Sequence, residues 1–123
     1  MVESFKILIV DDEPSIVVPL QFLMEKNGYR VLTAADGEEA IRISSSDRPD
    51  LILLDIMLPV RDGYEVCQAV RENPETRHSK IVFITAMGRE VDLAKGRAYG
   101  ADAYITKPFA NADVLATVKS LLG

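Results

Sequence analysis

The sequence is poor in the features that mark secreted, membrane-spanning and metal-thiolate proteins. Cys67 is the only cysteine among 123 residues, so neither an intramolecular disulfide nor a thiolate metal cluster can form. No apolar run approaches the roughly 20 residues that span a bilayer, and the N-terminal segment MVESFK lacks the layout of a secretory signal. We therefore expect a cytoplasmic protein with no membrane partner.

Positive charge is also scarce and scattered. The chain has 14 Lys and Arg against 19 Asp and Glu, which gives a net charge of -5, and no basic block or basic helix face stands out. Proteins that bind DNA or RNA through the phosphate backbone need such a surface. We expect this domain to make no direct contact with nucleic acid.

The length and the apolar content define the size of the fold. With 123 residues, of which 48% are hydrophobic, the chain can bury one substantial core and is too short for two. We expect residues 1–123 to form one domain.

Five apolar, strand-like runs alternate with amphipathic stretches of helical length. The runs occupy residues 6–10, 30–34, 51–54, 81–84 and 103–106. This alternation is typical of a parallel sheet that is covered by helices on both faces and joined by right-handed crossovers. We expect an α/β fold with a five-stranded parallel sheet and five helices.

Two of the expected helices have irregular sequences. The first has Pro14 at a favoured first-turn position, but Pro19 falls inside its apolar stripe, so we expect a kink or a later start. The fourth, over residues 89–99, is weak because an interior glycine costs ~1 kcal/mol relative to alanine. Three glycines punctuate it, Gly88, Gly96 and Gly100. We expect this helix to move.

Charged and hydroxyl side chains follow or end four of the strand-like runs. They are Asp11 and Asp12 after the first run, Asp55 after the third, Thr85 after the fourth and Lys107 after the fifth. The carboxyl ends of parallel strands meet at one edge of a sheet, so these residues should form one site. Three clustered carboxylates repel one another, and raised pKa values or a bound divalent cation would relieve that repulsion. A cation beside Lys107 would make a receptacle for a phosphoryl group.

Each part of this pattern also has an ordinary structural explanation. The acidic pair could cap the helix that begins at Pro14, a Lys-Pro pair could form a surface turn, and Thr85 is simply a good strand former. Asp55 at the end of a second buried strand favours a metal site instead, and Mg²⁺ suits hard oxygen ligands and phosphate. With its charge shielded by the metal, Asp55 could act as a nucleophile and form an aspartyl phosphate.

Four motifs resemble those of the receiver domain of bacterial two-component response regulators. They are DDE at 11–13, DIMLPVRDG at 55–63, TA at 85–86 and KPF at 107–109. The resemblance covers essentially the entire chain and implies the flavodoxin-like, doubly wound sheet with strand order 2-1-3-4-5. It also implies a signalling phosphoacceptor, not a conventional enzyme, that catalyses its own phosphorylation and slow dephosphorylation.

The resemblance implies roles for the acidic residues. Asp55 would accept a phosphoryl group from a phosphohistidine on a sensor histidine kinase or a histidine phosphotransfer protein. Asp12, Asp55 and the backbone carbonyl of Met57 would bind Mg²⁺ directly, and Asp11 would bind it through water.

The resemblance further implies a switch. Lys107 would bind a phosphoryl oxygen, and Thr85 would do so in the active state, while the ring of Tyr104 would turn inward as Thr85 moves. These changes would remodel the surface of the fourth helix, fifth strand and fifth helix. The implied partners of that surface are a downstream effector protein, a fused output domain or a second copy in a phosphorylation-dependent homodimer.

Met57 and Met87 lie two residues after Asp55 and Thr85, at the positions that flank the phosphoryl group in this family. Hydrolysis needs a water molecule aligned with the scissile bond, and two thioether side chains offer it no hydrogen-bond partner. We therefore expect slow self-dephosphorylation.

Three alternatives fit the sequence less well. A haloacid dehalogenase-like phosphohydrolase also uses an aspartate nucleophile but carries a second acid two residues later, where this chain has Met57. A flavin-binding module needs a phosphate-cradling loop after the first strand, and the segment DDEPS places carboxylates there. A degenerate receiver that only binds proteins would not need the full set of five site residues.

Overall fold

Five parallel strands form one sheet in the computed structural model, which describes residues 4–86 and 90–123. The strands are β1 (Lys6–Val10), β2 (Arg30–Ala34), β3 (Leu51–Leu54), β4 (Lys80–Thr85) and β5 (Ala103–Thr106). Their order in the sheet is β2-β1-β3-β4-β5. The expected α/β class and the flavodoxin-like strand order 2-1-3-4-5 are confirmed.

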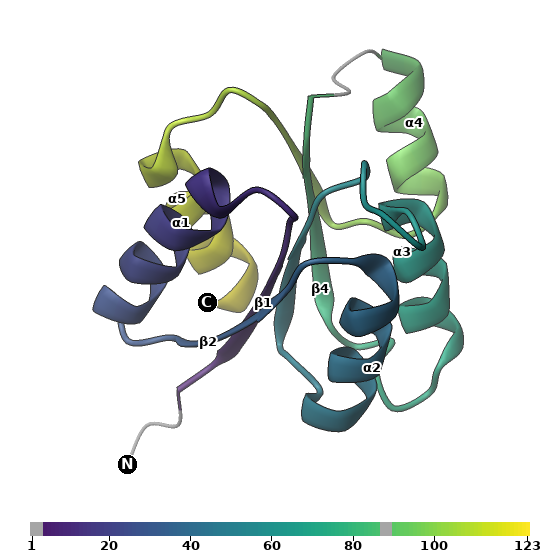
Figure 1. The fold of residues 1–123 in the computed structure, drawn as a ribbon, viewed down its shortest axis with the longest axis horizontal. Coiled ribbons are helices and arrows are strands. Elements are labelled where there is room, and N and C mark those ends of the chain that lie inside the picture. Colours follow the sequence, from purple (N-terminus) through teal and green to yellow (C-terminus); the bar gives the residue numbers. More distant parts are fainter. Residues whose placement is uncertain (1–3, 87–89) are drawn as a thin grey trace.

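Helices cover both faces of this sheet. They are α1 (Pro14–Lys26), α2 (Gly37–Asp47), α3 (Gly63–Glu72), α4 (Glu90–Ala98) and α5 (Asn111–Leu122). Figure 1 shows α1 and α5 together on one face and α2, α3 and α4 on the other. Within the part of the chain that the structure describes, no helix is long and apolar enough to cross a membrane.

Each strand contributes to two separate cores because successive side chains point to opposite faces of a sheet. In β1, Leu8 and Val10 join the core under α2 and α3, whereas Ile7 and Ile9 join the core under α1 and α5. All four side chains are at most 2% exposed. Burial on both faces explains why the sequences of β1, β3 and β4 are continuous apolar runs and not alternating ones.

The first helix begins at Pro14 and continues through Pro19, so the alternative of a later start is wrong. A proline in the first turn removes only an N–H that has no helical partner. Pro19 is exposed, whereas Leu20 and Met24 of the same helix are buried in the core. Burying two such side chains contributes ~1.5–3 kcal/mol each, which offsets the ~3 kcal/mol cost of an interior proline.

Aspartate caps fix where α2 and α3 begin. Asp36 Oδ1 accepts a hydrogen bond from the amide of Glu39 at 2.8 Å, and Asp62 Oδ1 accepts one from the amide of Glu65 at 2.9 Å. A cap of this kind satisfies an amide that has no partner within the helix. Asp62 therefore ends the loop that follows β3 at a defined residue.

Within the described residues, helix α4 ends at Ala98, one residue before the expected end at 99, and it packs closely on the sheet through Gly96. A Cβ atom at Gly96 would lie 3.2 Å from the rings of both Phe83 and Tyr104. Gly100 follows the helix with φ +95°, in the left-handed region that favours glycine. Gly88 lies outside the described residues.

Candidate functional site

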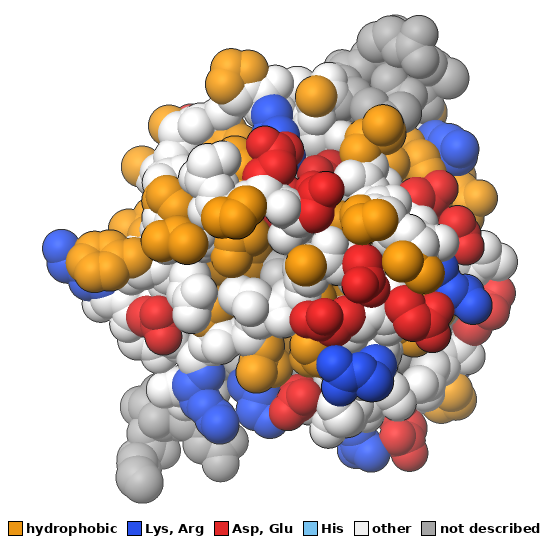
Figure 2. All heavy atoms as spheres, in the orientation of Figure 1, with side chains coloured by type: hydrophobic (Ala, Val, Ile, Leu, Met, Phe, Trp, Pro, Cys, Tyr) orange, Lys and Arg blue, Asp and Glu red, His pale blue; other side chains and the backbone are white. Residues whose placement is uncertain are grey.

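Lys107 lies among three carboxylates at the carboxyl edge of the sheet. Its Nζ atom is 3.0 Å from Asp11 Oδ2, 3.0 Å from Asp55 Oδ2 and 3.2 Å from Glu13 Oε1. Lys107 is 52 residues from Asp55 and 96 from Asp11 in the sequence. The fold therefore creates one charged cluster from three distant segments, and Figure 2 shows acidic side chains gathered in this region of the surface.

The strand register places the two buried aspartates side by side. Val10 pairs with Leu54 in the sheet, and Asp11 and Asp55 are the residues that follow them. The Asp55 amide donates to the Val10 carbonyl at 3.0 Å. The parallel ladder thus continues one residue beyond the strands and fixes the backbone of the phosphoacceptor candidate.

Backbone amides orient both aspartate side chains. Asp11 Oδ1 accepts a hydrogen bond from the amide of Glu13 at 2.9 Å, and Asp55 Oδ1 accepts one from the amide of Met57 at 3.2 Å. The second oxygen of each aspartate faces Lys107. Asp11 and Asp55 are only 5% and 4% exposed, so both carboxylates are held in place in a largely dry environment.

The cluster has more negative than positive charge, and its pKa shifts reflect this. The pKa of Asp11 is raised, with burial as the largest cause; the charge of Asp55 also raises it, whereas hydrogen bonds from the Glu13 amide and Lys107 lower it. Burial alone would lower the pKa of Lys107, but Asp11 and Asp55 together raise it. One ammonium shared by three carboxylates is strongly held, whereas each carboxylate is only partly neutralised.

The acidic residues also form a donor set that fits a hard divalent cation. Carboxylate oxygens of Asp11, Asp12, Glu13 and Asp55 all lie within 4.8 Å of one another. Asp12 and Glu13 are exposed, so the cluster is open to water on one side. Mg²⁺ prefers oxygen ligands and keeps several waters, which suits carboxylates at a solvent-exposed edge.

Thr85 and Tyr104 lie on the strands that border this cluster. The Thr85 side chain is fully buried, and its carbonyl accepts a hydrogen bond from the Lys107 amide at 2.8 Å. Tyr104 is half-buried, and its ring packs edge-on against Phe83 at a centroid distance of 6.0 Å. The structure thus links Thr85 to Lys107 through the backbone and places Tyr104 against the neighbouring strand.

An aromatic row continues from Tyr104 beneath α4. It consists of Tyr104, Phe83, Tyr64 and Tyr99. Tyr64 is 5.5 Å from Phe83 and 5.2 Å from Tyr99 between ring centroids. Lys95 Nζ from α4 lies 4.3 Å from the centre of the Tyr64 ring, a cation–π contact. The row connects the edge of the sheet to both α3 and α4.

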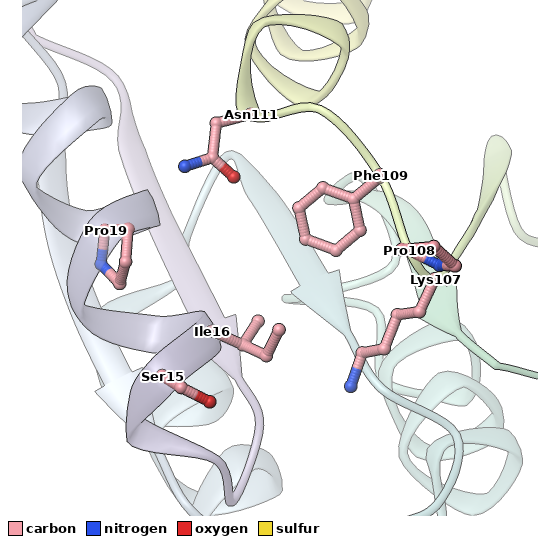
Figure 3. Close-up of a pocket in the computed structure, with 7 residues that line it drawn as sticks. All are labelled: Ser15, Ile16, Pro19, Lys107, Pro108, Phe109 and Asn111. Atoms are coloured by element: carbon pink, nitrogen blue, oxygen red, sulfur yellow. The ribbon is translucent and has the colours of Figure 1, made fainter.

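A pocket of about 340 Å³ opens beside Lys107 between α1 and the start of α5. Figure 3 shows the Phe109 ring and the Ile16 side chain on its opposite walls, with the Lys107 ammonium at its edge. Its lining residues are Ser15, Ile16, Pro19, Lys107, Pro108, Phe109 and Asn111. The Lys107-Pro108 peptide bond is cis. The charged cluster thus has an apolar wall on this side.

The loop between β3 and α3 rests on the start of α2. The amide of Gly37 donates to the Pro59 carbonyl at 3.3 Å, and Arg61 Nε is 3.0 Å from Glu38 Oε2. In the same loop Val60 has φ +70°, a left-handed conformation that a β-branched residue rarely adopts. The loop that begins at the candidate phosphoacceptor is therefore held by contacts with α2 and carries backbone strain at Val60.

Glu13 completes the acidic run DDE, but no role was predicted for it from the sequence. Its contact with Lys107 shows that it belongs to the cluster. The available signal was a third consecutive acid after a buried strand. Of the residues expected to flank the phosphoryl group, Met57 has an exposed side chain and Met87 lies outside the described residues.

Comparison with known protein families identifies a match over most of the chain. The family model for the response regulator receiver domain matches residues 7–119. The chain is 49% identical, over 117 residues, to the alkaline phosphatase synthesis transcriptional regulatory protein PhoP of Bacillus subtilis (strain 168). That alignment covers 95% of this chain and 48% of PhoP, so the chain spans about half the length of this relative.

Solved structures show the same fold. Chemotaxis response regulator CheY4 of Vibrio cholerae superimposes with a TM-score of 0.91 at 33% identity, covering 97% of this chain and 99% of CheY4. The receiver domain of sensor histidine kinase PA1611 from Pseudomonas aeruginosa PAO1, with magnesium coordinated in its active site cleft, gives a TM-score of 0.89 at 31% identity. The second alignment covers 98% of this chain and 99% of that domain.

Proposed function

The chain belongs to the response regulator receiver domain family, and on that basis we propose that it accepts a phosphoryl group on Asp55 within a two-component or phosphorelay system. The observation that carries this proposal is the position of Asp55. Its carboxylate lies at the end of the central strand, is 4% exposed and contacts Lys107 at 3.0 Å. A positioned carboxylate is suited to attack phosphorus, and the partly buried ammonium beside it is suited to neutralise the charge of the phosphoryl oxygens.

The proposed reaction is an in-line displacement. A carboxylate oxygen of Asp55 forms a bond to phosphorus, and the bond from phosphorus to the imidazole nitrogen of the partner's phosphohistidine breaks. The electron pair stays on that nitrogen, which takes up a proton from solvent. The Met57 amide holds one Asp55 oxygen during this step, and Lys107 moves from the carboxylates to a phosphoryl oxygen.

We propose Mg²⁺ as the cofactor. Asp12, Asp55 and the backbone carbonyl of Met57 would bind the ion directly, and Asp11 would bind it through water. The bound ion would neutralise charge between the carboxylates and the incoming phosphoryl group. The closely spaced oxygen ligands and the raised pKa of Asp11 both support a cation at this position.

The proposed partners follow from the family. Residues 1–123 would act as one receiver domain that takes phosphate from a sensor histidine kinase or a histidine phosphotransfer protein. Phosphorylation would draw Thr85 toward the phosphate and turn Tyr104 inward, which would change the surface formed by α4, β5 and α5. That surface would then bind a downstream effector, a fused output domain or a second copy. The word "transcriptional" in the name of PhoP supports a fused output domain.

Phosphorylation by acetyl phosphate with Mg²⁺ tests the proposal, with intact mass as the readout. The wild-type protein should gain one phosphoryl group and Asp55→Asn should gain none. Asp62→Asn is a matched control, since asparagine caps a helix as well as aspartate does. An undiminished adduct in Asp55→Asn would assign the chemistry to another residue.

A further inference from the structure

Glu13 is the third carboxylate on Lys107 and the only one of the three that solvent reaches freely. Its Oε1 atom is 3.2 Å from Lys107 Nζ, and its side chain is 55% exposed. The side chains of Asp11 and Asp55 are 3% and 5% exposed. The ammonium therefore lies between two buried carboxylates and one carboxylate on the open side of the cluster.

The local backbone holds Glu13 in this position. Glu13 is the residue before α1, with extended backbone angles of φ −101° and ψ 108°, and its side chain makes no capping hydrogen bond to the helix. Its amide instead donates to Asp11 Oδ1 at 2.9 Å. A residue at the start of a helix commonly uses its side chain as a cap. Glu13 uses its carboxylate to contact Lys107.

This contact opposes the proposed role of Lys107. The ammonium must bind a phosphoryl oxygen, and every carboxylate that holds it competes with that oxygen. Asp55 is the proposed phosphoacceptor, and Asp11 is proposed to bind Mg²⁺ through water. Glu13, in contrast, has no described side-chain partner other than Lys107. Its negative charge also lies on the side from which an anionic phosphoryl donor can approach.

We propose that Glu13 is a positioning residue that restrains Lys107, competes with the phosphoryl group for its ammonium and so slows phosphorylation of Asp55. The inference rests on the proposed function. It predicts that the acid at position 13 sets how readily the domain accepts phosphate, while the identity of the acceptor is unaffected.

The variant Glu13→Gln tests this proposal because it keeps the size of the side chain and removes its charge. Glu25→Gln is the control: it makes the same change in net charge at an exposed position near the other end of α1. Both variants and the wild type are compared at Mg²⁺ concentrations shown to be saturating for each. The rate constant with acetyl phosphate and the affinity for beryllofluoride, from ¹⁹F NMR titration, are measured.

Glu13→Gln should raise both quantities by roughly two- to fivefold, the range expected when an exposed ion pair is removed. Glu25→Gln should match the wild type. Beryllofluoride binding involves no donor leaving group, so a gain there locates the effect at Lys107, and an unchanged melting temperature would exclude a general effect on folding.

A phosphorylation rate constant and a beryllofluoride affinity of Glu13→Gln that are equal to or lower than those of the wild type would overturn the inference. Slower phosphorylation together with weaker Mg²⁺ binding would instead assign Glu13 to the metal. These outcomes differ from failure of the proposed function, in which wild type and Asp55→Asn would label alike.

Discussion

Gly37, the first residue of α2, lies directly against the backbone carbonyl of Arg61 in the loop that follows Asp55. A Cβ atom on Gly37 would overlap that oxygen and its carbonyl carbon. The Gly37 amide also donates to the Pro59 carbonyl at 3.3 Å. The loop that carries the phosphoacceptor candidate is thus positioned by a helix from another part of the sequence.

Gly37→Ala should therefore lower the free energy of unfolding by about 1–3 kcal/mol, the usual cost of overpacking. Backbone atoms lie on both sides of the contact, so no side chain can move aside to relieve it. Urea unfolding measures the loss. The control is Ser45→Ala, an exposed change in the same helix that should have little effect. Equal stability of Gly37→Ala and wild type would contradict the close contact.

Val60→Gly should raise the free energy of unfolding, in contrast to Gly37→Ala. Val60 has φ +70° and is 75% exposed, so glycine would relieve a left-handed strain of ~1–2 kcal/mol and lose little burial. Glycine also increases the conformational entropy of the unfolded chain, which offsets part of this gain. The net stabilisation should be about 0.5–1 kcal/mol. Val18→Gly, at an exposed position inside α1, should destabilise the protein. A lower melting temperature for Val60→Gly would show that the strain is absent.

The sequence was sufficient to predict the strands because each is a short run rich in apolar residues, and β1, β3 and β4 are buried on both faces. Four of the five strands have the predicted bounds, whereas β4 (Lys80–Thr85) extends one residue beyond the predicted run 81–84 at each end. A strand end is set by backbone pairing, and Lys80 pairs with Leu51 although its side chain is charged. The start of α1 was harder to predict, since the burial that outweighs the cost of Pro19 depends on tertiary packing.

Sequence reasoning placed Asp11, Asp55 and Lys107 at one edge of the sheet, and the structure brings these three side chains into contact. It did not identify the partner of Glu13, because the direction of a side chain in a turn depends on backbone angles that strand periodicity does not encode. The functional roles of all these residues remain predictions that the phosphorylation experiments test.

Cys67 should be chemically inert in the folded protein. It is fully buried, its Sγ donates to the Tyr99 carbonyl at 3.2 Å, and burial raises its pKa from 9.0 to about 11. Because the folded pKa is the higher one, the associated stability is complete below about pH 9 and is lost as pH rises toward 11. Wild type should lose about 1–2 kcal/mol more stability than Cys67→Ala between pH 8 and 10.5. Parallel pH profiles of the two proteins would contradict this, as would rapid labelling of the native thiol at pH 8.

The proposed switch should appear in amide exchange. Phosphate adds about -1.5 to -2 charges, and its hydrogen bonds to Lys107 and Thr85 are worth roughly 1.5–3 kcal/mol each, enough to shift a modest conformational bias. Adding beryllofluoride and Mg²⁺ should change protection most from Arg89 to Thr106. Asp55→Asn should show no such change. A response concentrated at residues 30–47 would place the switch elsewhere.

Met57 should help to determine the lifetime of the phosphorylated protein. Its side chain is 66% exposed beside Asp55 and offers a hydrolytic water no polar partner. Met57→Asn should therefore speed phosphate release from the purified phosphoprotein, with each tenfold change corresponding to ~1.4 kcal/mol of barrier. Met57→Leu is the apolar control and should release phosphate at the wild-type rate. Equal or slower release from the asparagine variant would contradict the prediction.

The aromatic row gives the protein an intrinsic optical reporter. The sequence has four tyrosines and no tryptophan, so tyrosine dominates its near-ultraviolet absorption and emission. Three of those tyrosines, at positions 64, 99 and 104, belong to the row, and only Tyr29 lies elsewhere. Rotation of the Tyr104 ring would change its coupling to Phe83 and hence the near-ultraviolet circular dichroism. The proposed change of the surface around α4 and β5 should therefore be observable in real time on the unlabelled protein.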